Sequence, residues 1–177
     1  MLRPLLMAAL MTTAASSMAA SLPNTPVRTL DLSRYLGQWH EIAHLPMYFQ
    51  RQCVGDITAT YTRRADGSLG VHNACRTGTG AMDASDGVAR TTDQPGALKV
   101  RFAPAWLGWL PWVWADYWVI DLDADYQWAV VGSPSRKYLW ILSRQPGMNG
   151  ELFHNLTERA RQRGYPVERL VIAAPVR

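Results

Sequence analysis

The chain has 177 residues, a formal net charge of +4, 48% hydrophobic residues and 18% charged residues. This composition predicts one globular domain with a sizeable core and excludes a fibrous or largely disordered protein. The lysines and arginines are scattered along the chain, whereas a nucleic-acid-binding protein gathers them on one face or one helix. Composition and charge therefore argue against a nucleic acid as partner.

The N-terminus has the order of a secretory signal peptide. Arg3 is followed by an apolar run over residues 5–11 and then by small residues. The apolar run is far shorter than the roughly 20 residues that span a bilayer. We expect a signal peptide over residues 1–19, cleaved after Ala19 or, as a second choice, after Ala20. No cysteine lies near this site, so we expect an exported protein without an N-terminal lipid.

The stretch 37–46 contains two motifs that require different structures. His40, Glu41 and His44 have the H-E-x-x-H spacing of zinc metalloproteases, which bind the metal from one face of a helix. Gly37 and Pro46 leave no room for such a helix, and on a strand the two histidines would stand ~13 Å apart. We therefore predict a strand without a metal site, on which Glu41 faces inward and both histidines face outward, too far apart for acid–base catalysis.

A β-hairpin follows. Residues 57–62 and 69–75 alternate in the manner of strands, and Asp66-Gly67 between them is turn chemistry. Counted outward from this turn, Cys53 and Cys75 come close to opposite each other near the far end of the hairpin. Since two thiols in an exported protein usually form a disulfide, we predict one here rather than a metal site.

The rest of the chain predicts more strands and one helix. Short extended runs lie at residues 88–92, 98–102, 117–121, 128–131, 138–143 and 167–173. Between the last two, the periodicity indicates a helix over residues 149–163, with Asn149 as N-cap and Gly164 as its end. Its single apolar stripe favours packing against the outside of a sheet. Many short strands in one undivided chain are typical of an all-β barrel or sandwich.

Three stretches in this order resemble the signatures of lipocalins. Gly37-Gln38-Trp39, followed by Glu41-Ile42-Ala43, resembles the first signature. The turn at residues 123–126 resembles the second, with Ala124 in place of the usual threonine, and Arg144 matches the third. The structural signature residues would be Gly37, Trp39, Asp125, Tyr126 and Arg144. Residues 117–123 and 134–144 are most similar to bacterial lipocalins related to apolipoprotein D, although His40 stands where that group usually has tyrosine.

The resemblance implies a fold and a ligand site. We expect an eight-stranded antiparallel up-and-down barrel over residues 29–173, with the C-terminal helix outside and a short final strand. Trp39 would close one end, with the Arg144 guanidinium across its indole. The ligand-binding candidates are Glu41, Ala43, Tyr48, Tyr117, Val119, Tyr138, Trp140 and Leu142. The alternative is that these side chains fill the barrel completely.

Residues 102–116 form a second feature of interest. The tryptophans of this apolar connection are Trp106, Trp109, Trp112 and Trp114. In the lipocalin order the connection lies at the open mouth of the barrel. An apolar segment of this size usually marks a binding surface, so it would be either a lid over the ligand or a contact with a membrane surface. The alternative is that it folds back and fills the mouth as core.

The predicted function is that of a periplasmic carrier without catalytic residues or cofactors. It would hold a fatty acid, a lysophospholipid or a similar amphiphile for storage or transport in the cell envelope, as a monomer or weak dimer, with transient membrane contact. Association with the outer membrane stays open. Two alternatives are a lipocalin-fold enzyme acting on a small apolar substrate, and an envelope interaction module that uses the tryptophan-rich connection.

Overall fold

The computed structural model describes residues 21–177, so the predicted signal peptide lies outside the described residues. One nine-stranded sheet has the order β2-β3-β4-β5-β6-β7-β8-β1-β9, and a further pairing of β1 with β2 closes a barrel of eight strands. The strands are β1 (Gly37–His44), β2 (Cys53–Arg63), β3 (Leu69–Thr77), β4 (Met82–Thr91), β5 (Ala97–Arg101), β6 (Ala115–Leu122), β7 (Trp128–Gly132), β8 (Leu139–Ser143) and β9 (Val171–Ile172). All of their pairings are antiparallel. The predicted barrel is confirmed.

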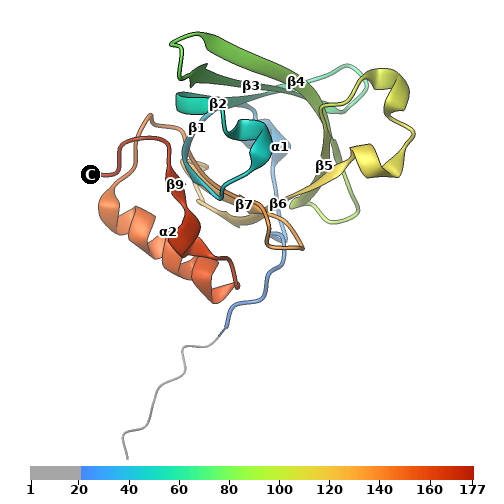
Figure 1. The fold of residues 1–177 in the computed structure, drawn as a ribbon. Coiled ribbons are helices and arrows are strands. Elements are labelled where there is room, and N and C mark those ends of the chain that lie inside the picture. The colour runs from blue at the N-terminus through green and yellow to red at the C-terminus, as the bar shows by residue number, and fades with distance from the viewer. Residues whose placement is uncertain (1–20) are drawn as a thin grey trace, which may run out of the picture.

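Two helices flank the barrel differently. Figure 1 shows α1 (Leu32–Tyr35) within the outline of the ring of strands and α2 (Gly150–Gln162) outside it. No helix of the described residues has the length and hydropathy of a membrane span. The connections also contain four short 3-10 helices, η1 (Tyr48–Gln50), η2 (Ala105–Leu107), η3 (Pro111–Val113) and η4 (Val167–Arg169).

One end of the barrel is closed by Trp39, which is fully buried. The Arg144 guanidinium lies 3.8 Å from the centre of the indole ring and donates hydrogen bonds to the carbonyls of Gln38 and Leu36 at 2.7 and 2.9 Å. The indole nitrogen in turn donates to the carbonyl of Tyr35 in α1 at 2.9 Å. A cation over an aromatic face, with its donors satisfied by backbone oxygens, holds this closed end together.

The turn between β6 and β7 joins the same end. The backbone N–H of Asp31 donates to the Tyr126 hydroxyl at 2.8 Å, and the Arg34 guanidinium lies 4.3 Å from the centre of the Tyr126 ring. Arg34 also lies 3.8 Å from the carboxylate of Asp125. The signature residues that are far apart in sequence therefore meet around α1.

The predicted hairpin and disulfide are both present. Gly67 adopts a φ of +82° in the turn, a conformation that suits glycine. Cys53 and Cys75 are bridged, with 5.5 Å between their Cα atoms. Register shifts in β2 place Cys53 opposite Thr77 rather than opposite Cys75, so the bridge joins diagonal neighbours at the open end of the barrel.

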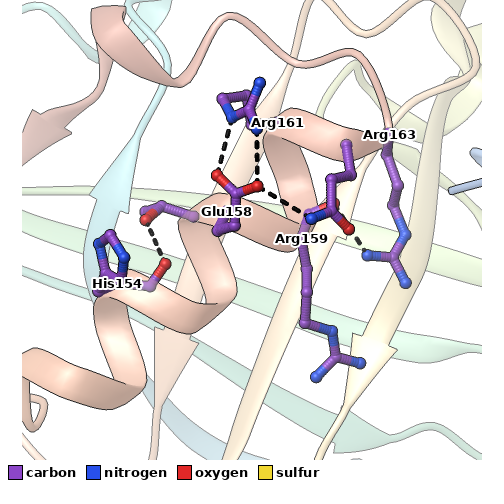
Figure 2. A network of polar contacts seen from close by, with 7 residues as sticks. His154, Glu158, Arg159, Arg161 and Arg163 are labelled. Atoms are coloured by element: carbon purple, nitrogen blue, oxygen red, sulfur yellow. Dashed lines mark hydrogen bonds and ion pairs between the residues drawn. The ribbon is translucent and has the colours of Figure 1, made fainter. Parts of the chain in front are cut away.

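Helix α2 packs against the outer wall, as its apolar stripe predicts. The Asn149 side chain accepts hydrogen bonds from two backbone N–H groups of the first turn. Leu156 and Ala160 are buried in a cluster with outer-face residues of the barrel. On the exposed face, Figure 2 shows the Arg161 guanidinium holding both carboxylate oxygens of Glu158, at 2.8 and 2.7 Å.

The final strand is shorter than predicted. The expectation for residues 167–173 is wrong over its first half, where η4 forms instead. Pro166 has no N–H to give to a sheet, and the N–H of Leu170 bonds to the carbonyl of Val167 within the 3-10 turn. Within residues 167–173, Val171 and Ile172 pair with β1, and the N–H of Ala173 donates to the carbonyl of Ile42 at 2.8 Å.

Candidate functional site

The barrel interior, here called the lumen, is lined by alternate residues of each strand. Tyr117, Val119 and Leu142 are buried in one apolar cluster with Trp39, and Trp140 packs against that cluster. A further aromatic side chain, Tyr138, lies against Trp140 with 6.1 Å between ring centres and 14° between planes. Five of the predicted ligand-binding residues thus belong to the inner wall: Tyr117, Val119, Tyr138, Trp140 and Leu142.

A β-bulge in β1 decides which side chains of the first strand face the lumen. Before the bulge, Glu41 pairs with Leu142 of the inner wall. After it, Ala43 pairs with Ile141, which belongs to the outer cluster beneath α2. Between these two pairings β1 advances by two residues while β8 advances by one, so Ile42 is the extra residue of the bulge.

Beyond the bulge the alternation of inner and outer residues is reversed. The predicted inward orientation of Ala43 is wrong, because this residue is buried in the outer cluster. The predicted outward orientation of His44 is wrong too, because it pairs with Trp140 and faces the lumen. His40 precedes the bulge and pairs with Ser143 on the outer face. The two histidines of the H-E-x-x-H motif thus lie on opposite faces of a strand.

The bulge assembles a buried polar group in the open half of the lumen. The Nδ1 atom of His44 lies 2.5 Å from Oε1 of Glu41, with both side chains only 7% exposed. This close approach does not have the geometry of a hydrogen bond, and Nδ1 has no hydrogen-bond partner among the described residues. The expectation that Glu41 and the histidines cannot converge is therefore wrong for His44.

The segment at the mouth adds an amide to this group. Gln50, in η1, donates from Nε2 to Oε1 of Glu41 at 2.6 Å. Its Oε1 accepts from the indole nitrogen of Trp140 at 3.4 Å, a long hydrogen bond. Tyr48, a predicted ligand-binding residue in the same segment, is 78% exposed and meets the edge of Phe49. The mouth segment therefore places one side chain in the lumen and leaves Tyr48 in solvent.

Three tyrosines lie deeper in the lumen. The Tyr117 hydroxyl lies 2.7 Å from both the Tyr35 and Tyr61 hydroxyls. Burial raises the pKa of Tyr61 to about 12 and raises the pKa of the other two phenols well above the usual value. Since Tyr61 and Tyr117 come from strands on opposite sides of the barrel, their contact bridges the lumen. The closed half is filled by side chains, and any ligand space lies in the open half.

One more polar group lines the lumen. Asn73 pairs with Ala59, a residue of the inner wall. Its Oδ1 atom is buried without a hydrogen-bond partner among the described residues. A buried acceptor without a partner costs free energy unless a water or ligand satisfies it. Asn73 and the Glu41–His44 pair are therefore groups for which a ligand head would complete the hydrogen bonding.

The tryptophan loop (residues 102–114) connects β5 and β6 at the open end. Figure 1 shows this segment, in yellow, to the side of the ring of strands rather than across it. Trp106, Trp109 and Trp112 are 74%, 79% and 76% exposed. The Trp114 ring instead lies under the Arg90 guanidinium, 4.0 Å from its centre. The loop thus holds three indoles in solvent and one against the outer wall.

Other features of the described residues lie outside the lumen. Two shallow surface clefts are open to solvent, one between the N-terminal segment and the end of α2 and the other beside Pro146 and Pro175. No group of three or more His, Cys, Asp or Glu side chains within residues 21–177 is arranged to hold a metal ion.

Sequence reasoning missed His44, Gln50 and Asn73 as residues of the site. The signal for Asn73 is present, since it continues the alternation of Val71 and precedes Cys75 on the same face. Gln50 lies in an irregular segment that has no periodicity to interpret. His44 faces inward only because of the bulge, which no local residue pattern announces.

Comparison with known proteins agrees with this architecture. The lipocalin-like domain profile matches residues 30–175. Among solved structures, insecticyanin from the tobacco hornworm Manduca sexta superposes with a TM-score of 0.63 at 20% identity, covering 89% of this chain and 95% of its own. The cockroach allergen Per a 4 gives 0.64 at 15% identity, covering 88% and 95%. At these identities the likeness concerns the fold alone.

Several relatives are similar in sequence. Temperature-induced lipocalin-1 of Arabidopsis thaliana is 41% identical over 147 residues, covering 81% of this chain and 78% of its own. The outer membrane lipoprotein Blc of Escherichia coli K12 is 37% identical over 167 residues, covering 93% and 90%. Apolipoprotein D of Mus musculus is 28% identical over 159 residues, covering 84% and 79%. The predicted resemblance is thus confirmed, and the chain belongs to the lipocalin family.

Proposed function

We propose that this protein is a non-catalytic carrier that holds an amphiphile, such as a fatty acid or lysophospholipid, in the open half of its lumen. The observation that carries the proposal is a wall of apolar side chains, including the partly buried Val100 and Trp140, beside the buried polar group of Glu41 and His44. A few polar groups among apolar lining side chains are what an acyl chain with a polar head requires.

The Glu41–His44 pair also resembles an acid–base pair, which an enzyme would need. Among the described residues, however, the hydrogen bonds of this pair lead to Gln50 and not to a serine or threonine hydroxyl. Both cysteines are joined in the disulfide. A binding role therefore accounts for more of the site than nucleophilic catalysis does.

The proposed location is the periplasm, at or near the outer membrane. The signal-peptide pattern of residues 1–19 supports export. The similarity to Blc, whose name describes an outer membrane lipoprotein, supports a place in the cell envelope. A carrier in this compartment would store amphiphiles or move them between membranes.

Ligand titration tests the carrier proposal. We expect at least one long-chain fatty acid or lysophospholipid to bind with a Kd well below about 1 mM. Trp140→Ala removes a large part of the inner wall and should weaken binding by about tenfold, or about 1.4 kcal/mol. Displacement of a fluorescent fatty acid measures both values.

A matched control separates wall contacts from general loss of packing. Trp128 is also half-buried, but it packs on the outer face against the cluster under α2. Trp128→Ala should therefore leave the Kd unchanged while lowering thermal stability. Equal loss of binding in both variants, or no binding of any long-chain amphiphile to the wild-type protein, would refute the carrier proposal.

The tryptophan loop is proposed as a contact with membrane surfaces. Its exposed indoles, Trp106, Trp109 and Trp112, are of the kind that sits at the headgroup level of a bilayer. The loop lies beside the barrel, which disfavours the lid interpretation (Figure 1). Arg90 over Trp114 adds a cation at the base of the loop.

Co-sedimentation with vesicles tests this contact. The wild-type protein should sediment with phosphatidylglycerol-containing liposomes, and Trp109→Ala/Trp112→Ala should stay in the supernatant, because exposed indoles supply the interfacial affinity. Ligand affinity in the absence of vesicles should be the same in both proteins. If the double variant loses ligand affinity but not sedimentation, the loop is a lid and not a membrane contact.

A further inference from the structure

In the part of the chain that the structure describes, the buried lumen holds no side chain that is permanently positive. Among the described residues, the buried side chains that are acidic or basic are Glu41, His44, Arg101 and Asp121. Arg101 lies on the outer wall, with its guanidinium 5.2 Å from the centre of the Trp114 ring. Asp121 also lies outside, paired with arginines of α2. Within residues 21–177 the buried lumen thus holds a carboxylate and an imidazole but no ammonium or guanidinium group.

The Glu41 carboxylate and the His44 imidazole together do not neutralise an anionic head group, whether the imidazole is neutral or protonated. With neutral His44, the lumen carries the negative charge of Glu41. With protonated His44, the two side chains 2.5 Å apart form a pair without net charge. The buried phenols add no positive charge in any state. Bases near the mouth, such as Arg51 and Lys137, are exposed to solvent, which screens them.

The mouth offers aromatic faces instead. Tyr138 stacks on Trp140, and the Phe49 ring centre lies 6.1 Å from that of Tyr138. Trp140 is joined through Gln50 to the Glu41 carboxylate. Aromatic faces beside a carboxylate attract a cation, and this combination recognises ammonium groups in many sites.

The unpartnered groups of the lumen are also acceptors. Among the described residues, two lumen atoms are buried without a hydrogen-bond partner: Oδ1 of Asn73, which is an acceptor, and Nδ1 of His44, which is an acceptor when it carries no proton. The Glu41 carboxylate, which accepts from Gln50, has further acceptor capacity. An ammonium head brings N–H donors to these atoms, whereas a carboxylate head brings none. Charge, aromatic faces and hydrogen bonding therefore favour the same kind of head group.

We propose that the lumen selects amphiphiles with an ammonium head and discriminates against a free carboxylate. This inference rests on the carrier function proposed above and narrows its ligand class. The alkyl chain would lie along the apolar wall, and the ammonium group would take the place of the Gln50 amide at the Glu41 carboxylate, beside the aromatic side chains of the mouth. Long-chain amines and amine-headed phospholipids share this chemistry.

A chain-matched displacement series tests the selection. Tetradecylamine, tetradecanol and tetradecanoic acid, each below its solubility limit and below any micelle concentration, compete for the protein with a neutral fluorescent naphthylamine probe near neutral pH. We expect the amine to bind at least about tenfold more tightly than the acid, with the alcohol between them. A fourth arm, lysophosphatidylethanolamine, distinguishes an amine-headed phospholipid from a simple long-chain amine.

Two variants and one control assign the effect to the lumen. Glu41→Gln keeps the shape of the side chain and should bring the amine-to-acid ratio to within about threefold of one. Gln50→Glu adds a second carboxylate and should increase the ratio above that of the wild type. Glu151→Gln removes an exposed carboxylate from α2 and should change nothing. Thermal unfolding confirms that each variant is folded.

The outcomes separate the two proposals. An acid that binds as tightly as the amine, or a ratio that neither lumen variant changes, would overturn the head-group selection while the carrier function stands. Failure of all four ligands and of the probe to bind would overturn the carrier function and the selection with it.

Discussion

The three phenols of Tyr35, Tyr61 and Tyr117 show how single residues set the depth of the site. Their hydroxyls form a chain of two contacts of 2.7 Å across the barrel. Because these side chains are buried, their neutral forms are favoured in the folded state. The bridge fills the closed half of the lumen, so the proposed ligand would lie beside this cluster and not in its place.

This burial predicts a loss of stability in alkali. In the unfolded chain a phenol loses its proton near about pH 10, whereas in the folded protein the pKa of Tyr61 is about 12. Between these values the folded state binds more protons, so stability is full below pH 10 and falls as the pH rises, by up to about 1.4 kcal/mol per pH unit for each phenol. Urea unfolding at several pH values measures the slope.

Tyr61→Phe gives the matched comparison. The variant keeps the ring and removes one buried titrating group, so its stability should fall less steeply above about pH 10. The Tyr117 hydroxyl keeps its contact with Tyr35 in this variant. Parallel pH profiles of the two proteins would contradict the assignment of the slope to this cluster.

At the scale of elements, the attachment of α2 depends on a buried carboxylate from β6. Asp121 is 7% exposed and lies 2.6 Å from the Arg159 guanidinium and 3.5 Å from that of Arg163. Burial raises the pKa of Asp121, and the two arginines oppose this rise. Because the Asp121 carboxylate is buried and is shared by two arginines at one end of α2, we assign it a structural role.

Removal of this carboxylate should loosen the helix. Asp121→Ala leaves the Arg163 guanidinium, only 12% exposed, without its charge partner, and we expect a loss of about 2 kcal/mol or more in the free energy of unfolding. Urea unfolding checks this value. Glu158→Ala removes an exposed ion pair of the same helix (Figure 2) and should have little measurable effect. If both variants lose the same stability, burial is not the cause.

The position of the tryptophan loop at the mouth could not be predicted from the sequence. Composition indicates that residues 102–114 are apolar and that Pro104 and Pro111 break any long helix. The placement of the loop beside the barrel depends on contacts with another strand, since Trp114 lies against Arg90 of β4. Because this contact joins two segments that are distant in sequence, no pattern within either segment predicts it.

For the whole molecule, the all-β class could be predicted because its information is local and repeated, and the choice of a barrel over a sandwich came from the resemblance to lipocalins. Alternation along the strands, the glycine turn of the hairpin and the apolar stripe of α2 each specify one element. Trp39 and Arg144 then come into contact because β1 and β8 are neighbours in the closed barrel. The disulfide followed from the same count along the hairpin.

The residue patterns established the all-β class, the disulfide hairpin and the outer helix, and the resemblance to lipocalins added the closed barrel with Trp39 and Arg144 at one end. The tertiary structure alone decided the chemistry of the lumen, in which His44 turns inward to meet Glu41 and Gln50 completes the group. The physical reason is register. One extra residue in β1 reverses the face of every side chain after it, and whether that residue is accommodated depends on the pairing with β8 and not on β1 itself.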